Sequence, residues 1–239
     1  TGFLLTAIPN WTGRAPLRGM PLVSLWLLWL AGRLAMAAPG SVPFLSAVID
    51  ASFLVMLAAL AWHEIAAAGM WNRSPIGALI TLYAAANMLF HTFALHAVPT
   101  DAPERLALSI LFMLLTVIGG RVTPAFTGEY LKEQRITPPP VPFSRFDGLS
   151  MLLVLIAILA WNVQPESYAA GALFLAAGVA TLVRLSGWRG WLAWREPLVF
   201  ILTVGYGWVG LSLLALGVFI SFRIFAFPDI TAEGSFTLG

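Results

Sequence analysis

Long apolar runs separated by short polar segments set the pattern of this sequence. Each run holds roughly 20 mostly apolar residues, enough to cross a hydrocarbon core of about 30 Å as an α-helix. Pro, Gly or charged residues bound every run. The pattern therefore predicts an all-α fold, a polytopic transmembrane helix bundle that forms one domain over residues 1–239. We expect seven spans, near residues 20–38, 46–68, 76–97, 106–124, 148–163, 168–185 and 198–220.

The composition favours the same class of protein. Of the 239 residues, 59% are hydrophobic and 10% are charged, whereas soluble domains carry about 25% charged residues. The formal net charge is +2, but the basic residues lie mostly between the apolar runs, so we expect membrane lipids and no nucleic acid as partners. The chain has no cysteine, which excludes disulfides and thiolate metal sites built from its own residues.

The basic residues also predict an orientation. If successive loops alternate between the two sides of the membrane, ten Lys and Arg residues fall on the side of Thr1 and two on the other. The positive-inside rule then makes the Thr1 side cytoplasmic. The longest loop, residues 125–147, is a cytoplasmic linker in this arrangement, and its triple proline 138–140 favours an extended segment.

A tryptophan-rich segment, LSGWRGWLAWREP, lies on the same predicted side. Trp188, Trp191 and Trp194 recur at three-residue spacing among arginines. This pattern is typical of an aromatic and basic anchor at the membrane interface. The same residues would also serve as a site for anionic lipid headgroups.

Few polar residues fall at membrane depth, where burial is costly without a partner or a task. Arg33 lies in the first span and Asp50 in the second, with the short turn APGSVP between the spans. Both residues are therefore expected near the same ends of adjacent antiparallel helices. They form a structural ion pair or line a proton or anion path, and spacing does not separate these alternatives.

The third predicted span contains Asn87 and His91, which are four residues apart and share a helix face. A buried imidazole must donate or accept a hydrogen bond. His91 is thus either a core histidine bonded to a neighbouring helix or a ligand to haem or copper. In the second case Asn87 or a facing carbonyl is expected to hold the other ring nitrogen.

Arg121 lies at the end of the fourth predicted span, in IGGRVTPAFTG. Its guanidinium could reach the cytoplasmic interface or hold an anionic group such as a carboxylate or a haem propionate. Pro124 is expected to end or kink this helix.

Three segments carry a resemblance to a known family: GFLLTAIPNWTGRAPLRGMPL at the start, NMLFHTFALHA around His91, and GGRVTPAFTGEYL after the fourth span. They resemble the NnrS family of bacterial inner-membrane haem and copper proteins. The resemblance implies a bundle of about a dozen spans with this chain as its central segment, and a role in the response to nitric oxide and nitrosative stress, including denitrification. It also implies haem and copper as cofactors, with His91 as a metal ligand.

Two other classes of function remain open at this point. A small-solute or ion transporter or channel would place Arg33, Asp50 and Arg121 along its path, but neither broken helices nor related halves are evident. A membrane scaffold for respiratory or denitrification enzymes would need no histidine within the membrane, so metal content separates it from a haem or copper protein. No motif assigns a reaction, and enzyme status stays undecided.

Overall fold

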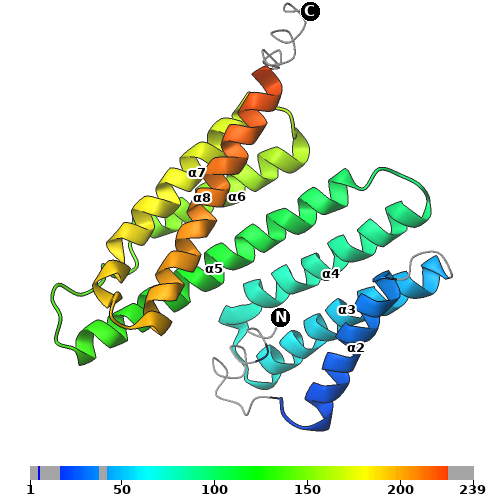
Figure 1. Cartoon of the computed structure of the whole chain (residues 1–239), viewed down its shortest axis with the longest axis horizontal. Helices are drawn as coiled ribbons and strands as arrows, with labels where there is room; N and C mark the ends of the chain where they lie inside the picture. The colour runs from blue at the N-terminus through cyan, green and yellow to red at the C-terminus, as the bar shows by residue number, and fades with distance from the viewer. Residues whose placement is uncertain (1–4, 6–16, 38–41, 226–239) are drawn as a thin grey trace, which may run out of the picture. The chain divides into compact units, whose positions relative to one another are not determined.

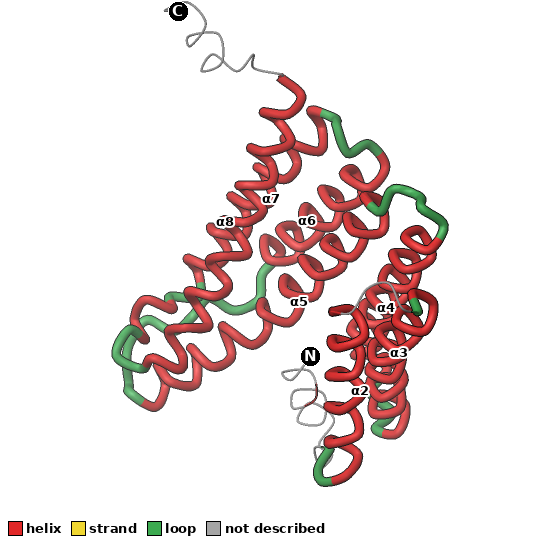
Figure 2. Tube along the Cα trace, turned by 45° about the vertical axis from the view of Figure 1, so that its right-hand side comes forward, coloured by secondary structure: helices red, strands yellow, loops and turns green. Residues whose placement is uncertain are grey.

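The regular structure of the protein is helical throughout the described residues, which in the computed structural model are 5, 17–37 and 42–225 (Figure 1). The helices follow the predicted spans closely (Figure 2). This confirms the all-α fold class. The elements in chain order are α2 Met20–Ala37, α3 Pro43–Ala67, η1 Trp71–Arg73, α4 Ser74–Leu95, α5 Asp101–Glu133, α6 Arg145–Val163, α7 Tyr168–Gly187, η2 Gly190–Ala193 and α8 Pro197–Phe225.

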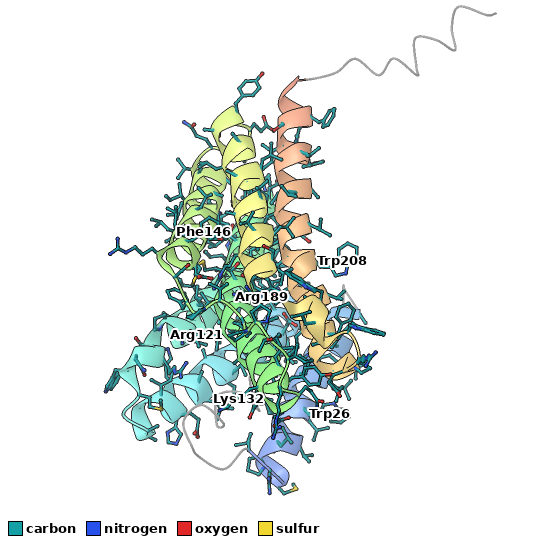
Figure 3. The ribbon with its side chains drawn as sticks, turned by 90° about the vertical axis from the view of Figure 1, so that its left-hand side faces the viewer. Trp26, Arg121, Lys132, Phe146, Arg189 and Trp208 are labelled. Atoms are coloured by element: carbon teal, nitrogen blue, oxygen red, sulfur yellow. The ribbon has the colours of Figure 1, made fainter. Side chains whose placement is uncertain are left out.

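Seven of the described helices are long and apolar enough to cross a membrane, which confirms the predicted number of spans. Their outward faces carry large apolar side chains in positions exposed from the protein, among them Trp26 and Trp208, which Figure 3 labels. Extended apolar surface of this kind is expected where helices face lipid. The protein is therefore a multi-pass membrane protein.

The chain divides into two compact units, Thr1–Leu111 and Phe112–Gly239, and each is described by itself. In the first unit α3 packs against both α2 and α4. In the second unit α7 packs against both α6 and α8. The single transmembrane domain over residues 1–239 stays a prediction.

Glycines bring α7 and α8 into close contact. A Cβ added to Gly178 of α7 would lie 2.6 Å from Leu214 Cγ, and one added to Gly217 of α8 would lie 2.9 Å from the Gly171 carbonyl oxygen. Small residues at such contacts let backbones approach within a membrane. Beside this contact an apolar core forms from Val154, Ala157, Ile158, Trp161, Ala170, Phe174, Ala177, Val209, Leu213 and Ile220.

One predicted boundary is wrong. We expected the fourth span to end near Pro124 and a loop to occupy residues 125–147, but α5 continues through Pro124 to Glu133. The link to α6 is therefore residues 134–144. Pro124 has no N–H, so it leaves the carbonyl of Gly120 without its helical partner. Another side chain bonds to that carbonyl, as described below, so the helix tolerates the proline.

Candidate functional site

Asp50 is the centre of a buried polar cluster in the first unit. It lies on α3, is 5% exposed, and its Oδ1 accepts a hydrogen bond from Nη2 of Arg33 on α2. Gly32 permits this approach, because a Cβ there would lie 3.2 Å from the Cα of Asp50. The structure thus brings together the two residues that the sequence placed at matching depth. The opposite charges offset each other, which lowers the cost of a carboxylate at this position.

The other carboxylate oxygen of Asp50 contacts α4. Oδ2 lies 3.0 Å from Nε2 of His91 and accepts a hydrogen bond of 3.1 Å from Nδ2 of Asn87. Asn87 and His91 therefore share a helix face, as predicted, but the face points at Asp50. We expected Asn87 or a carbonyl to hold a ring nitrogen of His91, and in the structure the Asp50 carboxylate makes that contact instead.

This geometry indicates which ring nitrogen of His91 carries a proton. The Asp50 carboxylate can only accept hydrogen bonds, so Nε2 is the donor. In the neutral ring Nδ1 then keeps its lone pair. No described residue hydrogen-bonds to Nδ1. His91 is buried, with its side chain 9% exposed, and Phe90 packs edge-on against its ring.

The donor set can be tested against the cofactors that the sequence suggests. An imidazole fixed by a carboxylate on one nitrogen is the usual setting of a metal-ligating histidine, so His91 would be able to hold a metal ion through Nδ1. A copper site with several protein ligands does not fit the described residues taken alone, because they contain no group of three or more His, Cys, Asp or Glu side chains able to hold a metal. Asn87 Oδ1 is also buried without a described hydrogen-bond partner.

Arg121 does not join this cluster through any described contact. It lies on α5 in the second unit, and its side chain is exposed (Figure 3). Because α5 continues to Glu133, Arg121 lies within the helix and not at its end, where the sequence had placed it. A role for Arg121 in holding an anionic group stays a prediction.

A second buried cluster lies in the second unit, and the sequence analysis missed it. Arg184 of α7 is 4% exposed and donates from Nε to Oδ1 of Asp147 on α6 at 2.9 Å. Its Nη1 donates to the hydroxyl of Tyr206 on α8 at 2.9 Å, and its Nη2 reaches the carbonyl of Gly120 on α5 at 3.5 Å. The Cζ atom of Arg184 lies over the ring of Trp188, 5.0 Å from the ring centroid. We call this the Arg184 cluster.

The local sequence explains how α5 accommodates Arg184. A Cβ on Gly120 would lie 2.5 Å from Nη2 of Arg184, so only glycine leaves room for the guanidinium. Pro124 cannot donate to the Gly120 carbonyl, which leaves that oxygen free to accept from Arg184. Gly119 has a similar role, because a Cβ there would lie 2.7 Å from the ring of Tyr206. Glycines followed by a proline four residues later were the available signal for such a contact.

Asp147 is held from two directions. It is the N3 residue of a capping box at the start of α6, where its Oδ2 accepts from the backbone N–H and the hydroxyl of Ser144, both at 2.7 Å. Its Oδ1 remains for Arg184. The pattern Ser-x-x-Asp was visible in the sequence as a helix start. Nothing in the sequence showed that the same carboxylate pairs with a residue 37 positions later.

These features define a polytopic helical membrane protein in whose described helices two buried carboxylates pair with arginines and an imidazole, that of His91, is buried. A family model described as NnrS protein matches residues 1–233, nearly the whole chain. The chain belongs to the NnrS family. No curated protein and no solved structure matches it.

Proposed function

We propose that this NnrS-family protein acts in the bacterial inner membrane in the response to nitric oxide and nitrosative stress, and that His91 ligates its haem or copper. The observation that carries the proposal is the contact between His91 Nε2 and Asp50 Oδ2 at 3.0 Å. This contact supports a proton on Nε2, because a carboxylate only accepts hydrogen bonds, and Nδ1 would then be the nitrogen that binds the metal.

The neighbouring residues support this role. Arg33 and Asn87 both donate to Asp50, so the carboxylate stays ionised and does not take the proton of the imidazole. An imidazole bonded to a carboxylate is a stronger electron donor than an isolated one. A haem iron or copper ion bound there would supply an open coordination position for nitric oxide.

The experiment compares two histidines in the full-length protein. His91→Ala is expected to lose most of the haem or copper that the purified wild-type protein carries. His96→Ala is the matched control, because His96 is the C-cap residue of the same helix, is exposed, and its Nδ1 contacts the Thr92 carbonyl at 2.8 Å. His96→Ala should keep its metal content.

A second variant separates metal binding from folding. His91→Gln keeps a donor for Asp50 but provides no nitrogen lone pair. It should therefore lose the metal while its melting temperature stays close to that of the wild type. Unchanged haem and copper content in both His91 variants would refute the ligand role.

A further inference from the structure

The core of the second unit separates into a polar half and an apolar half. On α6, Asp147 and Ser150 precede the apolar core residues that begin at Val154. On α8, Tyr206 likewise precedes Val209. On α7, which runs the other way, the polar residues Thr181 and Arg184 follow Ala177, the last apolar core residue of that helix. The buried polar residues of all three helices therefore gather at one end, where α6 begins and α7 ends.

Four hydroxyls in this polar half have no described hydrogen-bond partner although their oxygens are buried. They belong to Thr116 and Thr127 of α5, Ser150 of α6 and Thr203 of α8. The whole residues Thr116, Thr127 and Ser150 are 0% exposed. A buried hydroxyl without a partner costs free energy, and buried polar groups usually bond to protein or to ordered water. Four such oxygens in one half of a core point to a common partner.

Each helix places its hydroxyl close to the Arg184 cluster. Thr116 is four residues before Gly120, Ser150 is three residues after Asp147, and Thr203 is three residues before Tyr206. Residues at these spacings are neighbours on one helix face. Thr116, Ser150 and Thr203 therefore lie within about one turn of Gly120, Asp147 and Tyr206, the residues of the Arg184 cluster on α5, α6 and α8. A Cβ on Gly190 would collide with Thr203, so the η2 turn covers that hydroxyl from outside.

We propose that this half of the unit is an aqueous half-channel: water enters beside Asp147 and Arg184 and hydrogen-bonds to the hydroxyls of Thr116, Thr127, Ser150 and Thr203. Asp147 is the third residue of α6 and Arg184 lies in the last turn of α7, so the entrance is near the end of the unit. From Thr127 to Thr116 the path follows α5 for about 16 Å, roughly half the thickness of a hydrocarbon core. The apolar core that begins at Val154 ends the path, so water enters the interior of the unit but does not cross the membrane.

Single cysteines can measure water access directly, because residues 1–239 contain none. Ser150→Cys and Thr116→Cys are made in the full-length protein, with any cysteine elsewhere replaced. Infrared spectra in D₂O follow the exchange of the thiol S–H for S–D. Val154→Cys is the matched control, because Val154 lies one turn further along α6, is 0% exposed and belongs to the apolar core.

The half-channel predicts that the thiols at positions 116 and 150 exchange at least about tenfold faster than the thiol at 154, because only the first two contact water in the folded state. Equal slow exchange at all three positions would overturn the proposal. The isosteric substitution Thr116→Val is an independent test. It should change the melting temperature in opposite directions for a hydrated and for a dry hydroxyl. A hydrated hydroxyl makes the substitution lower the melting temperature, whereas a dry, unpartnered hydroxyl makes it raise the melting temperature.

Discussion

The buried carboxylates Asp50 and Asp147 are each held by an arginine from a neighbouring helix and by at least one further donor. Within a membrane, such pairing lowers the free-energy cost of burying the charged side chains. The two sites differ in exposure, because the Arg33 side chain is 54% exposed and the Arg184 side chain is 2% exposed. Arg184 is therefore enclosed by protein, whereas Arg33 also reaches the surface of its unit.

The Arg33–Asp50 pair predicts a coupling between two substitutions. Arg33→Leu leaves the buried carboxylate without its counter-charge and should lower the free energy of unfolding by about 1–3 kcal/mol, less than for a fully buried pair because Arg33 is half exposed. Asp50→Asn removes the charge but keeps groups that can bond to Asn87 and His91. The double variant should therefore be more stable than Arg33→Leu alone. Denaturation of all four proteins measures the coupling, and simple additivity would show that the pair contributes nothing.

At this scale the sequence predicted the Arg33–Asp50 pair as one of two alternatives, and it missed both the contacts of Asp50 with α4 and the Arg184 cluster. Arg33 and Asp50 could be matched because a short turn connects their helices, which fixes their relative depth. The sequence did not mark Arg184 as buried, because an arginine in the last turn of a helix can point outward to the interface as easily as inward. Its partners come from three other helices, and their positions depend on packing that hydropathy does not describe.

At the scale of elements, apolar run length was enough to predict the seven helices. Where hydropathy failed, at the end of α5, the reason was local chemistry: Pro124 breaks one backbone hydrogen bond, and Arg184 bonds to the carbonyl that is released. The glycines of α8 differ in how closely they pack against α7. A Cβ added to Gly210 would lie 2.7 Å from Cδ2 of Leu182, whereas a Cβ added to Gly205 would meet no atom within 4 Å.

The closeness of the α7–α8 contact predicts how alanine substitutions at its glycines change stability. Gly178→Ala should destabilise the protein by about 1–3 kcal/mol, because the new Cβ would lie 2.8 Å from the backbone nitrogen of Leu214 and the helices would have to separate. Gly205→Ala on α8 is the control, and should be neutral or stabilising by up to about 1 kcal/mol through helix propensity. Thermal denaturation in one detergent compares them. Equal effects of the two alanines would contradict close α7–α8 contact.

At the scale of the whole molecule, the charge bias between loops predicts that the side of Thr1 faces the cytoplasm. The link between α5 and α6 then lies in the cytoplasm, so a cysteine replacing Pro139 should react with a membrane-impermeant maleimide only in inverted vesicles. A cysteine at Thr100, between α4 and α5, should react only in intact cells with a permeable outer membrane. Labelling of Pro139→Cys from the periplasm would reverse the orientation.

Family membership follows from sequence motifs spread over most of the chain, whereas the role of His91 depends on the contact with Asp50 that only the structure shows. The most direct test of that role is the visible absorption spectrum of the purified full-length protein before and after addition of nitric oxide. The account predicts a metal-centred spectrum that shifts with nitric oxide in the wild type and in His96→Ala, and that is lost in His91→Gln. A nitric oxide response in His91→Gln equal to that of the wild type would contradict it.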